Sequence, residues 1–252
     1  MGVDEQMQDE FGTMAAWTRQ AVSDLGPDHA MPAACRGSGR PSGLDWLLTR
    51  LGPQPAGRLL DVGAGLGGPA AYAKMHTALR PVCVEPMRQA AAGAASLFGL
   101  PALMGDGARL PFASGSFRLA WSLGTLCTTD EKGLWLSELR RVLRPKGRLG
   151  LLVVMATGDS FDVPWGNAFP SEEELTWLLS AAGFMVLDAV WSDDLAPADA
   201  TWQRLEDEVE GAVRDAHGAD ERYATVKEQE RNLGELLESG RVRGRLLVAV
   251  GA

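Results

Sequence analysis

An apolar run that ends in an acid and a glycine cluster constrains this chain more than any other feature. Residues 58–62 read Arg-Leu-Leu-Asp-Val, and residues 63–68 follow as Gly-Ala-Gly-Leu-Gly-Gly. This order is typical of a buried parallel strand, a tight turn and a helix whose first amides face a ligand. Glycine supplies the turn dihedrals and lets a ligand approach the backbone closely. The spacing also fits the dinucleotide-binding fingerprint, so the motif alone leaves two ligand classes open.

The carboxylate of Asp61, just before the glycines, favours a cationic ligand over a pyrophosphate. A pyrophosphate at the helix start would lie close to this charge and be repelled, whereas a sulfonium or an ammonium would be attracted. S-adenosylmethionine carries both cations. At this point the chain resembles the class I S-adenosylmethionine-dependent methyltransferases of the small-molecule type, in which such an acid precedes the glycine motif.

A second acid, Glu85, ends the next short apolar stretch at residues 81–85. It follows Asp61 at close to the roughly 20-residue offset at which an acid binds ribose hydroxyls in sheets of this topology. One carboxylate offers acceptors for two adjacent hydroxyls. We therefore expect Glu85, with Pro86 beside it, to contact the cofactor; the alternative is an acid that only caps the following helix at residues 87–98.

Residues 105–112, Gly-Asp-Gly-Ala-Arg-Leu-Pro-Phe, resemble the GDAxxLPF segment of the same family, with Gly107 in place of the usual alanine. The resemblance implies that Asp106 accepts a hydrogen bond from the adenine amino group. It also implies that the next backbone amide, at Gly107, meets a ring nitrogen. Without this resemblance, Asp106 would be interpreted as an ordinary turn or helix-cap residue.

Residues 116–130 resemble the family segment SFDxVxSxxxLxHxxD, with two departures. Arg118 replaces the common acid, and Cys127 stands where histidine is usual. The resemblance implies that Trp121 and Ser122 border the methionine end of the cofactor, largely through their backbone. A base role at Cys127 is disfavoured, because an ordinary thiol is mostly protonated at neutral pH.

A third resemblance covers ELRRVLRPKGRL at residues 138–149, with Lys146 in place of the usual glycine. The basic residues look like a nucleic-acid patch in isolation. On a chain with a net charge of -9 they are better explained as a solvated helix face followed by a turn at 144–148. A near-continuous apolar run at 149–155 then fits a central parallel strand.

Together these segments predict an α/β fold with a doubly wound, seven-stranded, mostly parallel sheet. In the Rossmann-like methyltransferase fold that the chain resembles, the last strand, here 245–250, inserts antiparallel between strands five and six. We expect residues 1–41 to form an N-terminal helical lid segment, with a helix over 5–25. Residues 42–252 should form the methyltransferase domain, with Ser42 capping its first helix and a helical insertion at about 193–240.

Residues 34–40 contain two arginines among turn-forming glycines. The segment is either a plain connector or a loop over the active site. As a loop it could place Arg36 on the methionine carboxylate of the cofactor or on an acidic substrate group. We favour the cofactor contact.

The acidic balance argues against a non-specific nucleic-acid binder, and no apolar run approaches the roughly 20 residues of a membrane helix. The three cysteines are far apart and lack CxxC spacing, which indicates neither a zinc site nor a disulfide framework. We expect a cytoplasmic monomer or homodimer that acts on a small molecule and binds no metal, nucleic acid or membrane.

The predicted reaction is S-adenosylmethionine-dependent methyl transfer to a small-molecule acceptor by in-line displacement, which depends chiefly on alignment. A base is needed only for a protonated nucleophile, and the weak candidates are His29, Tyr72, Cys127 and Asp130. Two alternatives stay open: an NAD(P)-dependent oxidoreductase, and a protein that binds S-adenosylmethionine without turnover. The predicted cofactor residues are Asp61, Gly63, Ala64, Gly65, Glu85, Pro86, Asp106, Gly107, Trp121, Ser122 and Arg36.

Overall fold

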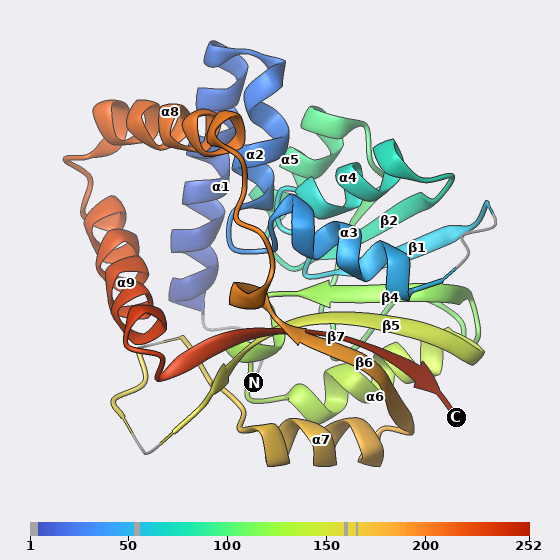
Figure 1. Ribbon diagram of the computed structural model, residues 1–252. Helices are drawn as coiled ribbons and strands as arrows, with labels where there is room; N and C mark the ends of the chain where they lie inside the picture. The colour runs from blue at the N-terminus through green and yellow to red at the C-terminus, as the bar shows by residue number, and fades with distance from the viewer. Residues whose placement is uncertain (1–4, 53–55, 159–160, 165) are drawn as a thin grey trace.

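One seven-stranded sheet runs through the molecule in the order β3-β2-β1-β4-β5-β7-β6 (Figure 1). The computed structural model describes residues 5–52, 56–158, 161–164 and 166–252. The strands are β1 Arg58–Val62, β2 Arg80–Glu85, β3 Ala102–Met104, β4 Phe117–Leu123, β5 Leu143–Ala156, β6 Phe184–Trp191 and β7 Val242–Gly251. The helices are α1 Glu5–Leu25, α2 Ala30–Cys35, α3 Pro41–Arg50, α4 Gly68–His76, α5 Arg88–Phe98, α6 Lys132–Val142, α7 Glu172–Ala181, α8 Ala200–His217 and α9 Glu221–Glu238, with short 3-10 turns at Pro27–His29, Leu126–Thr128 and Ser192–Asp194.

The predicted fold class is confirmed. Strands β1 to β5 pair in parallel, and β7 lies antiparallel between β5 and β6. Parallel strands buried on both faces need near-continuous apolar sequence, and β5 supplies it from Leu149 to Val153. The carboxyl ends of β1, β2, β3 and β4 therefore meet at one edge of the sheet, where ligands bind in folds of this kind.

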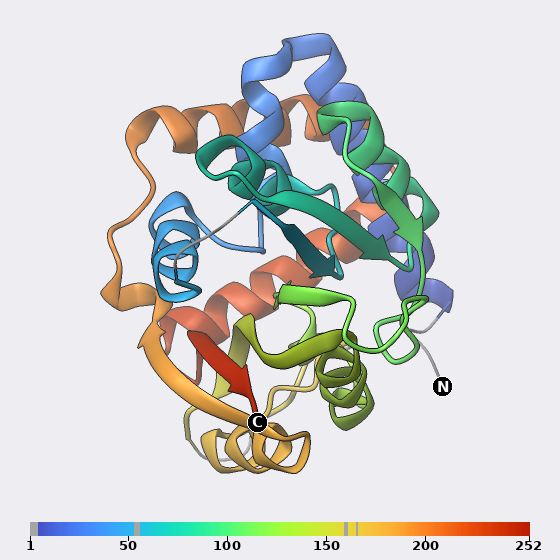
Figure 2. The ribbon, with the colours of Figure 1, turned by 90° about the vertical axis from the view of Figure 1, so that its right-hand side faces the viewer.

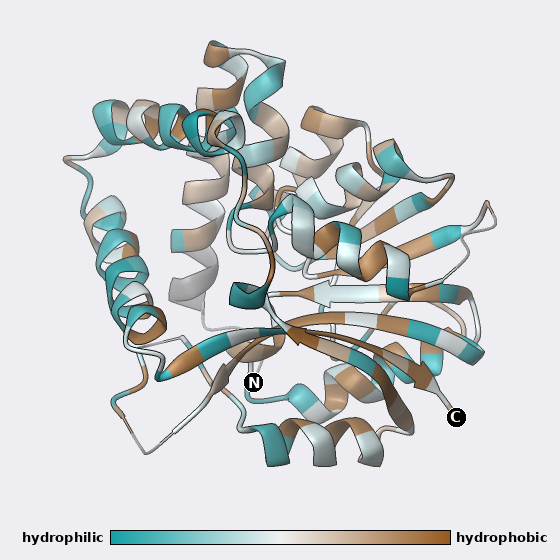
Figure 3. Ribbon diagram, in the orientation of Figure 1, coloured by the Kyte–Doolittle hydropathy of each residue, from teal (hydrophilic) through white to brown (hydrophobic). Residues whose placement is uncertain are grey.

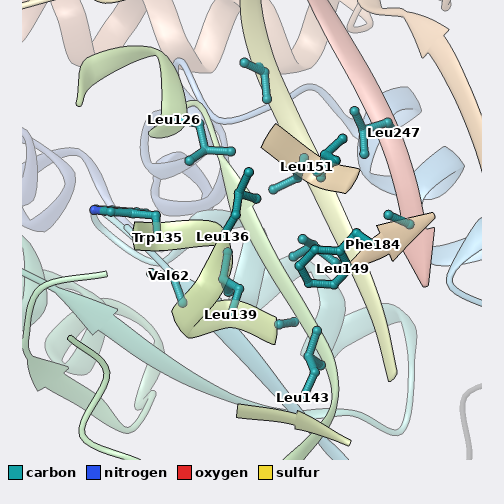
Figure 4. Packing of buried hydrophobic residues seen from close by; sticks show 14 of the residues in the cluster. Val62, Leu126, Trp135, Leu136, Leu139, Leu143, Leu149, Leu151, Phe184 and Leu247 are labelled. Atoms are coloured by element: carbon teal, nitrogen blue, oxygen red, sulfur yellow. The ribbon is translucent and has the colours of Figure 1, made fainter. Parts of the chain in front are cut away.

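Helices cover the sheet on both faces. Side chains alternate along each strand, so apolar side chains lie on both faces and are buried by helices. Leu59 of β1 packs with α3 and α4 in one core cluster, whereas Leu60 and Val62 join α6 and α7 in the other. Figure 4 shows Leu136 and Leu139 of α6 packed toward Leu149 and Leu151 of β5. Apolar residues accordingly concentrate on the strands in Figure 3, and hydrophilic residues on α8 and α9.

The N-terminal helix and the two late helices pack on one another. Helix α1 contacts α5, α8 and α9. A cluster of Val22, Ala33, Val209, Val213 and Tyr223 gives this unit its own small core. The helices α8 and α9 fall inside the predicted insertion at 193–240, and α1 spans the predicted 5–25. Of the described helices, none combines the length and the apolar character that crossing a bilayer requires.

Two local predictions are wrong. Ser42 does not cap α3: Arg40 is the N-cap residue and Pro41 opens the helix, while the Ser42 hydroxyl donates to Ala196 O. Proline is favoured at the first helical position because its missing N–H would be unsatisfied there. The predicted turn at 144–148 is instead part of β5, where the pairing steps from Phe117↔Leu143 to Leu119↔Arg148 across an irregularity. The sequence Gly-Pro-Gln-Pro at 52–55 also predicts the end of this helix, and Trp165 is one of the aromatic residues expected in a loop at 157–170; residues 53–55 and Trp165 lie outside the described residues.

The α6–β5 contact yields a test of the core. Leu136 is fully buried, whereas Leu134 on the same helix keeps 55% of its surface exposed. We expect Leu136→Ala to lower the free energy of unfolding by about 2–5 kcal/mol, because it removes buried methyl groups and leaves a cavity. Leu134→Ala should change it by less than about 0.5 kcal/mol. Urea denaturation of both variants measures the difference, and equal losses would contradict this packing.

Candidate cofactor site

The turn after β1 is held tightly to the end of β2. The amides of Gly63 and Ala64 both donate to Val84 O, at 2.8 and 3.2 Å. Gly63, Gly65 and Gly67 all have positive φ, a region that favours glycine. A Cβ atom on Gly65 would meet no atom within 4 Å, so the space beside this turn is open. The predicted glycine cradle is therefore present, with an open face for a ligand.

Glu85 lies at the end of β2 and reaches into this turn. Its Oε2 accepts a hydrogen bond from the Gly65 amide at 2.8 Å, and its Oε1 accepts one from the Met87 amide at 3.0 Å. Burial raises the pKa of this carboxyl, and the two amides oppose the shift. Because each carboxylate oxygen can accept two hydrogen bonds, Glu85 can hold the turn and still accept from a pair of hydroxyls.

Asp61 is almost fully buried, with 1% of its surface exposed. Its Oδ2 has no hydrogen-bond partner among the described residues. Burial raises its pKa to about 7; the nearby indole N–H of Trp121 opposes the shift without forming a well-aligned hydrogen bond, and the charge of Glu85 adds to it. A buried carboxylate oxygen without a partner costs free energy, and a cation or a hydrogen-bond donor would remove that cost.

Trp121 and Ser122 lie on neighbouring β4, and the two side chains point to opposite faces. Trp121 pairs across the sheet with Asp61 and is fully buried in the α3–α4 cluster. The Ser122 hydroxyl donates to Val62 O at 2.9 Å and also bonds to the Thr125 hydroxyl. Both side chains thus serve the packing beneath the site. Contact with a ligand through the backbone stays a prediction.

Asp106 and Gly107 follow β3 at the same edge. Asp106 Oδ1 accepts from the Ala108 amide at 2.9 Å, which makes the residue part of a local turn. A Cβ atom on Gly107 would lie 2.5 Å from the indole ring of Trp135. The departure from the usual alanine therefore has a packing cause: Trp135 of α6 occupies the place of the missing methyl group.

The segment at 34–40 rests against the glycine-rich turn. A Cβ atom on Gly68 would lie 2.4 Å from the carbonyl carbon of Ala34, and one on Gly124 would lie 2.7 Å from Gly37 O. Only glycine at 68 and 124 allows the end of α2 and the following loop to approach β1, β4 and α4 this closely. This placement supports a loop over the site rather than a plain connector.

Arg36 leaves this loop toward the late helices. Its Nη2 lies 2.9 Å from Glu210 Oε2 of α8 and 3.0 Å from Glu230 Oε2 of α9. Lys227 bonds to the same two glutamates, so two cations and two anions form one network. In this structure Arg36 pairs with Glu210 and Glu230, and its contact with the cofactor stays a prediction.

The four weak catalytic candidates do not form a group. His29 is engaged at both ring nitrogens, by Gly26 O and by Glu208. The Tyr72 hydroxyl donates to Asp45 Oδ1 at 2.8 Å, and burial and this contact raise its pKa. Burial also raises the pKa of the Cys127 thiol, which suits it poorly as a base. Asp130 is exposed after β4.

Sequence reasoning missed two residues that shape the site, Thr125 and Trp135. A Cβ atom on Gly63 would lie 2.2 Å from Thr125 Cγ2, so the threonine methyl lies directly over the first glycine of the turn. The Gly107 departure was the one available signal for Trp135, since a missing methyl often accommodates a bulky neighbour. Within the described ranges, no group of three or more His, Cys, Asp or Glu side chains is arranged to hold a metal ion.

The fold and the site together define the class I methyltransferase architecture. A glycine-rich turn after β1, an acid ending β2 and an acid after β3 all lie at the carboxyl edge of a sheet in which β7 is antiparallel. Residues 60–151 match the family described as "Methyltransferase domain". Over these residues the chain is therefore similar to a methyltransferase domain.

Individual relatives agree with this assignment. The chain is 31% identical to an O-methyltransferase of Pyrenophora dematioidea over 163 residues, which cover 57% of this chain and 60% of that protein. It thus spans less than two thirds of this curated relative. The [4+2]-cyclase SpnF has a similar structure, with a TM-score of 0.66, 24% identity and coverage of 82% and 80% of the two chains. Geranyl diphosphate C-methyltransferase from Streptomyces coelicolor A3(2) has a TM-score of 0.62, 15% identity and coverage of 83% and 75%. At these identities the two structures show the fold alone.

The raised pKa of Asp61 predicts a pH dependence of stability. Because its pKa is about 7 in the folded protein and about 3.8 otherwise, folding binds a proton between these values. The stability that this proton gives is complete at low pH and falls as pH rises toward 7, by at most about 1.4 kcal/mol per pH unit. Asp61→Asn removes the titration, so its stability relative to wild type should increase from pH 5 to 7 and then level off. Thermal unfolding across this range measures the difference, with exposed Asp215→Asn as control, and a difference independent of pH would contradict it.

The Arg36 network generates a second test. The ion pairs are partly exposed, so each contributes on the order of 0–1 kcal/mol and its loss should leave the fold intact. If Arg36 contacts the cofactor, Arg36→Ala should weaken binding of S-adenosylhomocysteine about tenfold, as expected for one charged hydrogen bond. Lys227→Ala breaks the same network and is the matched control. Calorimetric titration that finds equal losses in both variants, or none in Arg36→Ala, would exclude a direct contact.

Proposed function

We propose that this chain transfers the methyl group of S-adenosylmethionine to a small-molecule acceptor. The observation that carries the proposal is a buried carboxylate oxygen of Asp61, which has no hydrogen-bond partner among the described residues and lies beside a glycine turn with an open face. This arrangement fits a ligand that combines a positive charge with hydroxyl groups. It does not fit a pyrophosphate, because two buried acids, Asp61 and Glu85, flank the same turn.

The polar groups of the site suit the parts of S-adenosylmethionine one by one. Glu85 would accept hydrogen bonds from the ribose hydroxyls, and Asp106 with the Gly107 amide would meet the adenine. The negative charge of Asp61 would favour the cationic methionine end. When bound, this cofactor would supply a methyl group on a positively charged sulfur, to which a lone pair of the acceptor can bond in line while the carbon–sulfur bond breaks and the neutral thioether leaves.

The chain's contribution to the reaction is alignment and exclusion of water rather than proton transfer. Neither Cys127, whose pKa is raised, nor the hydrogen-bonded His29 and Tyr72 is placed as a strong base. The unit formed by α1, α8 and α9 lies on the carboxyl side of the sheet in Figure 1, where it would cover a bound acceptor. Phe161 and Phe169, with ring centroids 6.3 Å apart, add aromatic surface from the loop after β5.

A second candidate function is binding of S-adenosylmethionine without methyl transfer. It is favoured by one observation, the buried thiol of Cys127 where the family usually has histidine. The names of the relatives cover O-methylation, C-methylation and a [4+2] cyclisation. Product analysis is therefore the readout that separates methyl transfer from the other possibilities.

The first experiment is a thermal shift with cofactors. We expect S-adenosylhomocysteine to raise the melting temperature, because a ligand that binds only the folded state stabilises it. NAD and NADP should leave it unchanged, and stabilisation by NADP alone would favour an oxidoreductase.

In Glu85→Ala the affinity for S-adenosylhomocysteine should fall about 10- to 100-fold, since charged hydrogen bonds to the ribose are lost. If a folded Glu85→Ala variant bound S-adenosylhomocysteine with unchanged affinity, Glu85 would serve only to cap the turn.

The second experiment tests turnover. Purified protein is incubated with S-adenosylmethionine labelled in the methyl group and a library of small hydroxyl, amine and activated-carbon acceptors. Appearance of label in an organic product supports the proposal. Tight cofactor binding with no labelled product across the library would favour the binding protein instead.

A further inference from the structure

The amino edge of the sheet, opposite the cofactor residues, holds a groove with a concentrated positive charge. Five basic side chains line it: Arg58, Arg118, Arg144, Lys146 and Arg148. Its volume is about 780 Å³, within the range of small-molecule sites. The groove lies between the starts of β1, β4 and β5 and the end of α3, on the side of the molecule that faces the viewer in Figure 2.

No Asp or Glu is among the described residues that line the groove. The sequence segments 56–60, 77–84, 112–125 and 139–157, from which all the lining residues except Leu51 come, contain no Asp or Glu. Within the described part of the chain, none of the five lining residues forms an ion pair. The whole chain nevertheless carries 33 acidic against 24 basic residues. Like charges gathered on an acidic protein repel one another, and a bound anion would relieve that repulsion.

Backbone carbonyls, rather than carboxylates, hold three of the guanidinium groups in place. Arg148 donates to Arg50 O at 2.9 Å, Arg144 to Gly115 O at 3.2 Å and Arg58 to Ser116 O at 3.4 Å. Arg58 also lies 4.7 Å from the ring centroid of Phe117. A guanidinium has five N–H donors, so these anchors order the side chains and leave most donors free. Such an ordered fork matches the geometry of a phosphate group.

Two of the lining residues stand where the sequence departs from the methyltransferase pattern. Arg118 replaces the common acid, and Lys146 replaces the usual glycine. Lys146 has φ +60°, and it is the one non-glycine residue with positive φ in the described ranges. A left-handed conformation is unfavourable for a residue that carries a side chain. Lys146 adopts this conformation and places a cation in the groove.

We propose that this groove binds an organic polyphosphate of nucleotide size. The ordered arginines would hold the phosphate groups, and the apolar floor of Leu79 and Leu119 would contact the organic part. A compact anion is favoured over a nucleic acid, because the net charge of -9 repels a long polyanion that extends beyond the groove. The site is independent of the proposed methyl transfer, since its residues come from the opposite edge of the sheet.

The test is calorimetric titration of the full chain, saturated with S-adenosylhomocysteine, with UDP, tripolyphosphate and uridine. We expect UDP and tripolyphosphate to bind one to one and uridine not to bind. If the apolar floor contributes, UDP binds at least as tightly as tripolyphosphate despite its smaller charge. Tripolyphosphate binding without UDP binding would reduce the site to an inorganic phosphate site and overturn the organic part of the proposal.

Variants assign the binding to the groove. Arg118→Ala and Arg144→Ala remove exposed side chains, so folding should hold, and each should weaken UDP binding about tenfold. Arg231→Ala on α9 is the matched control, because its side chain is 64% exposed and lies far from the groove. Affinity for S-adenosylhomocysteine should stay unchanged in all three. The proposal would be overturned if UDP showed no saturable binding, or if Arg231→Ala lost as much UDP affinity as the groove variants. Tighter binding of an octaglutamate peptide than of UDP would also overturn it and would assign the groove to an acidic protein partner.

Discussion

Close approach of neighbouring segments to three glycines is the constraint on which the site depends. Thr125 lies over Gly63, Ala34 over Gly68 and Gly37 over Gly124, each nearer than a Cβ atom would permit. These contacts bring the end of α2 and the following loop onto the carboxyl edge of the sheet. A side chain at any of the three positions would displace the neighbouring segment and open the edge to solvent. At Gly68 and Gly124 the neighbouring wall of the site is thus main chain, whereas at Gly63 it is the side chain of Thr125.

The fold could be predicted largely because several motifs occur in order and at consistent spacing. Helix α1 matches its predicted bounds, and β7 inserts where the methyltransferase resemblance placed it. The errors arose where two local signals compete. Helix α3 begins at Pro41, so Ser42 lies inside the helix and cannot be its N-cap residue. Arg144 and Lys146 belong to β5, where its pairing with β4 is irregular, although their sequence is typical of a turn.

The site was predictable only in part, because spacing along the chain identifies strand ends but not the neighbours that pack on them. Asp61 and Glu85 could be predicted from their positions near the ends of strands, and Asp106 from its position just after one; the structure brings all three to one edge of the sheet. The indole of Trp135 over Gly107 and the methyl of Thr125 over Gly63 are contacts between distant segments, to which no periodicity points. The same holds for the ion pairs that join Arg36 to α8 and α9.

The antiparallel insertion of β7 also has a consequence for how the sheet assembles. Among the described strands, β6 pairs only with β7, and β7 joins it to β5. During synthesis β6 emerges well before β7, with α8 and α9 between them, so it has no hydrogen-bonding neighbour until residues 242–251 arrive. In that interval Met185, Val186 and Leu187, which are exposed even in the finished structure, lie on an unpaired strand. Such a strand is a ready template for pairing with another chain, so the nascent protein passes through its most aggregation-prone state just before the sheet closes.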